Sequence, residues 1–318
     1  MSDFIITDLL YKHKLIKDSL TIVDCGARGA SFQDWNSIHN KLTIHGFDPD
    51  ESECKRLNVE AQSQGFDHRY YPYFITGKKE KRSCYLTNNN SSNSLYEPNQ
   101  KRISRYRQLF MCEQMICTLE TVGLKERIEN IETTSLDEWA SDYGIMDVDF
   151  IKLDVQGAEL EILKGCNSLL HSVVGMNIEV WFVPIYIGQP LFADIDTHVR
   201  SRNFDFFTFH IYDAGQFVGR MASPVSFTKI NTIEDRKKVG QLVTADALYF
   251  RDPIQYGLMS LNKLVKLICF SELCHQIEYS FELLNVLALK MNDSEQVTTA
   301  ISQIIVEATQ HYNSNMKD

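Results

Sequence analysis

Short apolar runs alternate with helix-like segments along the first part of the chain. Each run is rich in β-branched or aromatic residues, as buried strands are, and most end at a turn of small or acidic residues. The expected strands are Leu20–Val23, Leu42–Phe47 and 68–76, and the expected helices are 3–17, 31–40 and Glu51–Gln64. The alternating order predicts a parallel sheet with helices on both faces, in which the turns that follow the strands share one edge.

The alternation breaks after residue 76 and resumes near residue 134. Between these points we expect a polar loop at 88–94, a helix at 98–110 and extended segments at 114–121 and 128–134. Beyond them the expected strands are Val148–Val155, Val173–Val180, 204–211 and 242–250, and the expected helices are Leu136–Tyr143, 158–170 and 193–201. Ser135 is a suitable N-cap for the first of these helices. The pattern therefore predicts an α/β fold with a mostly parallel, Rossmann-like sheet.

The composition changes near residue 252, where strand-like patterns end. The remaining chain carries three helical patterns with apolar faces, at 258–270, 274–289 and 294–312. We therefore expect an N-terminal helix within 1–19, the α/β domain in 20–252 and a C-terminal helical extension in 253–318. The extension either forms an appended bundle or packs back on the core, and its apolar faces favour a homodimer.

Composition and charge narrow the range of partners. None of the apolar runs in the 318 residues is long enough to span a membrane, and the N-terminus lacks a basic segment followed by an apolar stretch. A net charge of −10 disfavours binding to nucleic acid. We therefore expect a cytoplasmic protein with neither a membrane nor a nucleic-acid partner. The basic clusters at 78–82 and 101–107 are interpreted as solvated segments, with a local anion site as the alternative.

Eight cysteines are scattered along the chain without a CxxC pair. This usage predicts reduced thiols, most of them buried. Cys269, Cys274 and His275 lie in an apolar helical pattern, so we interpret them as core residues rather than as metal ligands.

Two of the expected strand ends carry residues suited to a nucleoside. Small residues after the first strand let the backbone approach a ligand closely, and the following helix presents unpaired N–H groups. Asp48 ends the second strand, 24 residues after Asp24, where an acid can accept both hydroxyl protons of a ribose. A helix N-cap is the alternative role for Asp48. The candidate cofactor-binding residues are Asp24, Gly26, Ala27, Arg28, Gly29 and Asp48.

Two further strand ends carry the candidate catalytic carboxylates, Asp154 and Glu179. Either one can act as general base toward a substrate hydroxyl, or the two can share a hydroxyl or a divalent metal with water ligands. No pattern in the sequence indicates a metal. His45 and His210 are alternative bases, although His45 is expected inside its strand and is interpreted as a core residue.

The residues around Asp154 also resemble a known family. The stretch 148–165, with 134–139 before it and 182–194 after it, resembles the signature of FkbM-family methyltransferases, and the similarity covers roughly residues 20–252. The resemblance implies a class I methyltransferase fold, S-adenosylmethionine as cofactor, and hydroxyl groups of sugars or natural products as acceptors. It also implies that the turn after Asp24 binds this cofactor and that Asp48 binds its ribose.

The turn departs from the family pattern at one point. Arg28 stands where the family often has Asn, and Gly29 comes one position early, with Ala30 at the usual glycine position. Arg28 either pairs with the carboxylate of the cofactor or crowds the site. The main expectation is therefore an O-methyltransferase that acts on a small-molecule or glycan acceptor.

Two other functions compete with this expectation. A nicotinamide-dependent oxidoreductase uses a similar turn and acid, but this turn lacks the full GxGxxG spacing. A non-catalytic binding or assembly module would result if the altered turn no longer held the cofactor.

Overall fold

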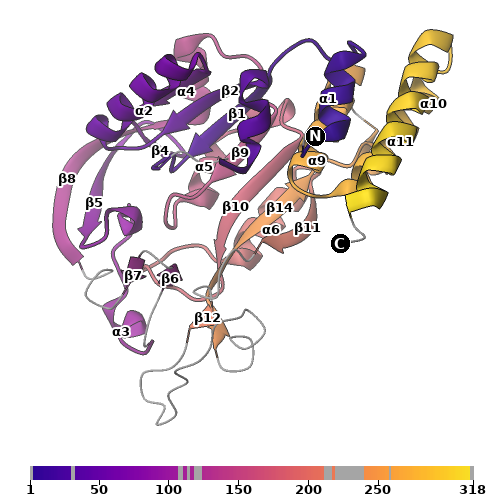
Figure 1. Ribbon diagram of the computed structural model, residues 1–318. Coiled ribbons are helices and arrows are strands. Elements are labelled where there is room, and N and C mark those ends of the chain that lie inside the picture. Colours follow the sequence, from indigo (N-terminus) through magenta and orange to yellow (C-terminus); the bar gives the residue numbers. More distant parts are fainter. Residues whose placement is uncertain are drawn as a thin grey trace.

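The computed structural model describes residues 3–29, 33–106, 110–112, 115–117, 124–210, 217–218, 240–257 and 259–315. Its centre is a seven-stranded sheet with the order β11-β14-β10-β9-β1-β2-β3 (Figure 1). These strands are β1 (Leu20–Cys25), β2 (Leu42–Phe47), β3 (Asp67–Tyr71), β9 (Phe150–Leu153), β10 (Gly175–Trp181), β11 (Asp205–His210) and β14 (Thr244–Phe250). Only β14 runs antiparallel to its neighbours within this sheet, which confirms the mostly parallel α/β class.

The order of the strands reverses beside β1. The chain builds β2 and β3 on one side of β1, and then places β9 and β10 on its other side. Cys25 at the end of β1 pairs in register with Phe47 of β2 and with Leu153 of β9. Ligands of open α/β sheets bind in the crevice that such a reversal opens at the carboxyl ends of the strands.

Helices cover both faces of this sheet (Figure 1). One buried cluster joins one sheet face to α1 (Ile5–Lys12), the 3₁₀ helix η1 (Gln33–Lys41) and the C-terminal helices. A second cluster joins the opposite face to α4 (Leu136–Tyr143), α5 (Glu159–Gly165) and α6 (Phe192–Arg200). The remaining helices of the α/β part are α2 (Glu51–Gln64), η2 (Asn90–Ser92), α3 (Gln100–Ile103) and η3 (Leu169–His171). The layers expected from the alternating pattern are therefore present.

Two helices begin and end at the residues that the sequence predicts, and capping residues explain these bounds. Asp50 caps α2 by accepting from the backbone N–H of Ser52 at 3.0 Å, and Gly65 ends the helix in the left-handed conformation. Ser135 caps α4 in a capping box with Glu138, whose carboxylate accepts from the backbone N–H of Ser135 at 3.0 Å. The N-cap role predicted for Ser135 is confirmed.

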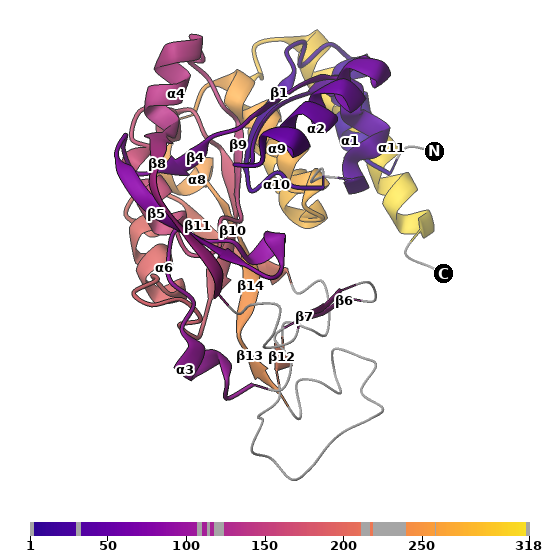
Figure 2. The same ribbon diagram turned by 90° about the vertical axis from the view of Figure 1, so that its left-hand side faces the viewer.

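A second, three-stranded sheet lies beside the first (Figure 2). It consists of β4 (Phe74–Thr76), β8 (Leu124–Ser135) and β5 (Lys81–Thr87). The single strand expected at 68–76 is therefore two strands in different sheets, because Pro72 lacks the N–H that a continuous ladder requires. The sequence did not predict β5. Two short pairs complete the strands: β6 (Phe110–Cys112) with β7 (Met115–Cys117), and β12 (Phe217–Val218) with β13 (Gln241–Leu242).

Three of the expected helices are shorter than predicted. The helix expected at 3–17 is α1, which spans only Ile5–Lys12. The helix expected at 98–110 is reduced to α3, and residues 107–109 lie outside the described part of the chain. The helix expected at 158–170 ends at Gly165. There the Asp137 carboxylate accepts from the backbone N–H groups of Asn167 at 2.9 Å and Ser168 at 2.8 Å, so these groups no longer bond to carbonyls one turn earlier.

The three C-terminal helices pack back on the core rather than forming a separate bundle. The last helices of the chain are α8 (Pro253–Tyr256), α9 (Leu261–Leu273), α10 (Ile277–Lys290) and α11 (Glu295–Asn315). Figure 1 shows α9, α10 and α11 grouped beside α1, and α9 to α11 share one apolar cluster with α1 and the sheet. No helix in the described residues is both long and apolar enough to cross a membrane.

Two buried polar contacts hold this extension to the α/β part. Lys266 of α9 donates to the Asp149 carboxylate at 2.8 Å, and Asp149 also accepts from the backbone N–H of Thr21. Glu272 of α9 accepts from the backbone N–H groups of Ile6 and Thr7, each at 2.7 Å. These contacts join the last helices to the first strand and the first helix.

The cysteines whose side chains are described are buried and free. They are Cys25, Cys54, Cys84, Cys166, Cys269 and Cys274. Cys269 and Cys274 belong to the apolar cluster under the C-terminal helices, which confirms the core positions predicted for them. The core position predicted for His275 is wrong, because its side chain is exposed at the turn between α9 and α10.

Candidate functional site

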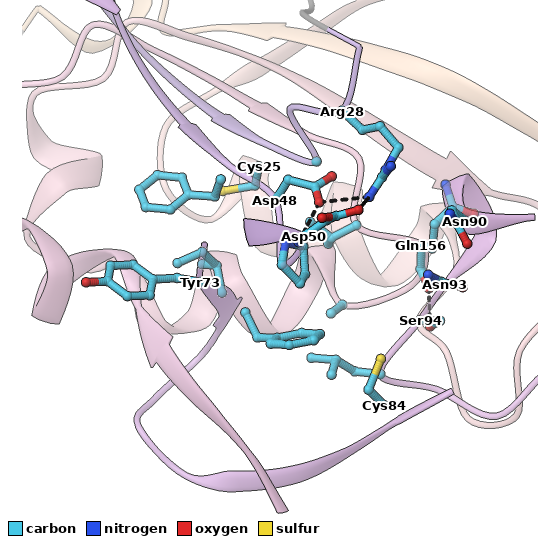
Figure 3. A pocket seen from close by; sticks show the side chains of 18 of the residues that line it. Cys25, Arg28, Asp48, Asp50, Tyr73, Cys84, Asn90, Asn93, Ser94 and Gln156 are labelled. Carbon is cyan, nitrogen blue, oxygen red and sulfur yellow. Dashed lines mark hydrogen bonds and ion pairs between the residues drawn. The ribbon is translucent and has the colours of Figure 1, made fainter. Parts of the chain in front are cut away.

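A cavity of about 560 Å³ opens at the carboxyl edge of the sheet, where the strand order reverses (Figure 3). The turns after β1, β2 and β9 form one side of it, and residues of β4, β5, β8 and the segment 90–95 form the other. The polar or small lining residues are Gly26, Arg28, Asp48, Asp50, Asn90, Ser91, Asn93, Ser94, Asp154 and Gln156. The larger apolar ones include Phe47, Tyr73, Phe74, Ile75, Leu86, Leu95, Ile128 and Ile131.

The turn after β1 approaches β9 so closely that only glycine fits at its first position. Gly26 has a φ of +90°, and a Cβ atom there would lie 1.9 Å from the carbonyl oxygen of Asp154. The backbone N–H groups of Gly26 and Ala27 both donate to the carbonyl oxygen of Phe47, at 2.9 and 3.0 Å. The turn is therefore held between the ends of β2 and β9.

The other residues predicted in this turn occupy different positions. Ala27 is buried and does not line the cavity. Gly29 is exposed, lies outside the lining, and its backbone N–H donates to Glu53 at 3.1 Å. Arg28 does line the cavity. Of the turn residues predicted for cofactor binding, the structure thus brings Gly26 and Arg28 to the cavity wall.

Arg28 joins the two acids that follow β2 (Figure 3). Its guanidinium lies 3.2 Å from Asp48 Oδ1 and 2.9 Å from Asp50 Oδ2. Asp48 Oδ1 also accepts from the backbone N–H of Asp50 at 2.8 Å, so Asp50 and not Asp48 is the helix cap. Burial raises the pKa of Asp48, whereas the Ser52 hydroxyl and Arg28 lower the pKa of Asp50. Asp48 remains at the cavity wall, where the sequence places an acid for ribose.

Asp24 lies beneath the turn and does not line the cavity. Its side chain is 1% exposed, and the Lys152 ammonium lies 3.5 Å from Asp24 Oδ1 and 3.6 Å from Asp154 Oδ2. Burial alone would lower the pKa of Lys152, but the carboxylates of Asp24 and Asp154 outweigh it and raise that pKa. Lys152 is therefore a fixed positive charge below the site.

The two candidate catalytic carboxyl groups differ in their access to the cavity. The Asp154 side chain is 40% exposed and lines it. Glu179 on β10 is 9% exposed and lies outside the lining. Glu179 accepts from the indole N–H of Trp181 at 3.1 Å, and burial and the nearby Asp154 raise its pKa well above the usual value.

The cavity also contains residues that the sequence did not single out. Gln156 follows Asp154, and its side-chain nitrogen lies 2.9 Å from Asp154 Oδ1 and 2.9 Å from Glu179 Oε2. The polar loop expected at 88–94 folds against this turn and contributes amide and hydroxyl groups to the lining. The available signal for the loop was its density of Asn and Ser, which is also typical of ordinary turns.

The alternative bases lie away from the cavity. His45 is buried beside Tyr71 and Trp139, and burial lowers its pKa to about 4, in keeping with the core position expected for it. His210 at the end of β11 does not line the cavity either, and burial lowers its pKa. Among the described residues, no group of three or more His, Cys, Asp or Glu side chains is arranged to hold a metal ion.

The described members of the two basic clusters contribute no anion site to the cavity wall. Arg82 donates to the Glu161 carboxylate at 2.8 Å, and Lys78 lies 3.2 Å from Glu80. Lys101, Arg102 and Arg105 lie in or directly after α3, and Arg107 lies outside the described residues. None of the described members of the two clusters lines the cavity.

Comparison with known proteins identifies relatives of this chain. The model of the methyltransferase FkbM domain matches residues 24–206. A 2-O-methyltransferase, NoeI, of Sinorhizobium fredii (strain NBRC 101917 / NGR234) is 37% identical over 68 residues, which are 21% of this chain and 28% of that protein. The chain therefore aligns with little more than a quarter of that relative.

Solved methyltransferase structures resemble the chain only distantly. Magnesium protoporphyrin IX methyltransferase (ChlM) from Synechocystis PCC 6803, with bound SAM, is 12% identical over 79% of this chain and 77% of that chain, with a TM-score of 0.35. M. capricolum TrmK, in complex with S-adenosyl-homocysteine, is 11% identical over 96% of both chains, also with a TM-score of 0.35. With such low scores, the assignment depends on the family match and on the strand order.

Proposed function

The chain belongs to the FkbM methyltransferase family, and from this premise we propose that its cavity binds S-adenosylmethionine and that it methylates a hydroxyl oxygen. Methyltransferases of this class take the methyl group from S-adenosylmethionine, which carries it on a positively charged sulfur. The observation that carries the proposal is that Gly26, Asp48 and Asp154, from three different strand ends, line one cavity.

The cavity fits such a cofactor in size and in chemistry. Its volume of about 560 Å³ lies within the range of small-molecule sites, roughly 300–1,000 Å³. Asp48 offers a carboxylate for ribose hydroxyls, and Tyr73, Phe74 and Ile75 offer an apolar wall for a purine ring. Gly26 brings the backbone close to the ends of both β2 and β9, so a ligand there contacts main chain rather than a side chain.

Asp154 is the base that we propose for the reaction. An acceptor hydroxyl must lose its proton as its oxygen bonds to the methyl carbon and the carbon–sulfur bond breaks. The Asp154 carboxylate opens to the cavity and receives this proton, whereas Glu179 lies behind it, closed off from the cavity. The Lys152 ammonium lies 3.6 Å from Asp154 Oδ2 and forms an ion pair with the proposed base.

The acceptor that we propose is a sugar, a glycan or a small natural product. The partial match to a 2-O-methyltransferase supports oxygen as the methylated atom. The lining beside Asp154 also supports it, because Asn90, Ser91, Asn93 and Ser94 present amide and hydroxyl groups that suit a neutral, hydroxyl-rich molecule. The alternative is a non-catalytic module, and the observation in its favour is the ion pair with which Arg28 engages Asp48.

Transfer of a labelled methyl group from S-adenosylmethionine to a panel of glycosides and glycans tests this proposal. We expect the wild-type chain to label at least one acceptor. Asp154→Asn should lower the rate by about 10²-fold or more, the usual contribution of a positioned base, while S-adenosylhomocysteine still binds. A parallel reaction with EDTA shows whether a divalent metal takes part. Full activity of Asp154→Asn would refute the assignment of the base.

A further inference from the structure

Gln156 has a backbone conformation that a residue with a side chain rarely adopts. Its φ is +58°, in the left-handed region, in the turn between β9 and α5. Two contacts hold the turn: the Ser94 hydroxyl donates to the carbonyl oxygen of Gln156 at 2.6 Å, and Glu159 accepts from the backbone N–H of Gly157. Strained backbone of this kind persists where the surrounding structure imposes it, and it is concentrated at functional sites.

The conformation directs the Gln156 amide between two carboxyl groups from different strands. Its nitrogen donates one hydrogen to Asp154 Oδ1 and the other to Glu179 Oε2, with both distances at 2.9 Å. Its oxygen lies 3.1 Å from the Tyr186 hydroxyl. An amide offers two N–H donors on one side only, so these three contacts determine which way it points.

The surrounding charges distinguish the two carboxyl groups that share this amide. Glu179 is enclosed, and the acids that face it are Asp154, Glu159 and, across the β10–β14 ladder, Asp246. A cation lies beside the pair, because the Lys152 ammonium is 3.6 Å from Asp154 Oδ2. Burial, together with these three acids, raises the pKa of Glu179 and favours its protonated form, whereas Asp154 is open to the cavity and beside an ammonium.

We infer that Gln156 is a positioning residue, whose amide holds Glu179 inside the sheet and presents the Asp154 carboxylate to the cavity. The inference rests on the proposed function, in which Asp154 receives the proton of the acceptor. Gln156 itself acts through Asp154 and does not exchange a proton. A single amide thus joins the solvent-facing carboxylate to the buried carboxyl group.

Trp181 provides a spectroscopic signal for this pair, because its indole N–H donates to Glu179. The full-length chain, labelled with 5-fluorotryptophan, should give three fluorine NMR signals, one for each tryptophan. Trp181→Phe assigns the relevant signal. Its chemical shift, followed between about pH 4 and 9, reports the ionisation of Glu179, whose pKa burial raises above its usual value.

Gln156→Gly is the informative variant, because glycine adopts the left-handed conformation without strain and the chain should still fold. Loss of the shared donor should raise the pH at which the Trp181 chemical shift is halfway through its change by at least about half a unit, since hydrogen bonds to a carboxylate favour its charged form. Gln156→Glu, which adds a third carboxyl group, should raise it further. Tyr186→Phe is the matched control, because it keeps both N–H donors and should shift the midpoint less.

Calorimetry with S-adenosylhomocysteine separates a positioning role from a structural one. We expect Gln156→Gly still to bind S-adenosylhomocysteine, with a loss of affinity smaller than its loss of turnover, because the amide contacts Asp154 and Glu179 rather than the Asp48 side of the cavity. A Trp181 signal that does not change with pH, or that changes at the same pH in both proteins, overturns the inference. If the wild-type protein fails to bind S-adenosylhomocysteine, the proposed cofactor is wrong, and the NMR titration still tests the role of Gln156.

Discussion

The close approach of the first turn to β9 predicts a sharp difference between two glycines that are three residues apart. Gly26 and Gly29 both have positive φ, at +90° and +79°, so alanine at either position incurs the cost of a left-handed conformation. That cost is about 1–2 kcal/mol for a residue with a Cβ atom. Their surroundings differ, because a Cβ at Gly26 would lie 1.9 Å from the Asp154 carbonyl oxygen, whereas a Cβ at Gly29 would meet nothing within 4 Å.

Gly26→Ala must therefore separate the turn from β9, and Gly29→Ala need not. Non-bonded carbon and oxygen require about 3 Å, so the turn or the end of β9 has to move by about 1 Å. A displacement of this size at a site that positions reactants costs about 10²-fold. We expect Gly26→Ala to weaken S-adenosylhomocysteine binding by at least tenfold and to reduce turnover further, whereas Gly29→Ala keeps the affinity within about threefold.

Isothermal titration with S-adenosylhomocysteine measures both affinities, and thermal unfolding shows whether each variant is folded. The two variants should lose similar amounts of stability from the backbone cost alone, with the additional loss confined to Gly26→Ala. Equal affinities for the two variants would refute the reasoning, because they would mean that the turn does not form the binding surface. Wild-type affinity in Gly26→Ala would refute it most directly.

Two further predictions concern stability. Glu272→Gln should lower the free energy of unfolding by about 1–3 kcal/mol, because one of the buried Ile6 and Thr7 N–H groups would face an amide donor instead of a carboxylate oxygen. Urea denaturation measures this loss, with the exposed Glu278→Gln as the control. An equal effect of the two changes would contradict the role of Glu272 as acceptor for the first turn of α1. Burial raises the pKa of Glu159 from 4.5 to about 7, so folding favours the protonated carboxyl group. The stability that the protonated group contributes is therefore complete below about pH 4.5 and is lost as the pH rises through about 7. The stability advantage of wild type over Glu159→Gln should therefore shrink across this interval, and a difference that stays constant or grows with pH would show that the carboxyl group titrates elsewhere.

The sequence predicts the sheet and its helices well where local patterns agree with tertiary structure. The strand at Leu42–Phe47 and the helices at Glu51–Gln64 and Leu136–Tyr143 have the predicted bounds, because hydrophobic periodicity and caps such as Ser135 act locally. By contrast, β5 was missed. This strand is rich in charged and polar residues, and it pairs with β8, from Lys81 opposite Glu132 to Thr87 opposite Leu124, a long-range pairing that no local pattern records.

The sequence indicated where in the fold the candidate site lies, but it did not indicate which side chains contact one another there. Asp48 and Asp154 could be placed at strand ends because parallel strands share an edge. The enclosure of Glu179, the ion pair of Arg28 with Asp48 and the shared amide of Gln156 depend on which atoms meet across strands. Spacing in the sequence does not contain that information. The contact of Glu272 with the first helix, 265 residues away in the chain, is missing from local patterns for the same reason.

Binding of S-adenosylhomocysteine to the purified wild-type chain, with NAD as the control ligand, tests the central claim most directly. The cavity beside Gly26, Asp48 and Asp154 predicts saturable binding of S-adenosylhomocysteine in the micromolar range and no binding of NAD. Binding should weaken in Gly26→Ala but persist in Asp154→Asn. The absence of S-adenosylhomocysteine binding would contradict the account and would favour a module in which Arg28 keeps Asp48 engaged.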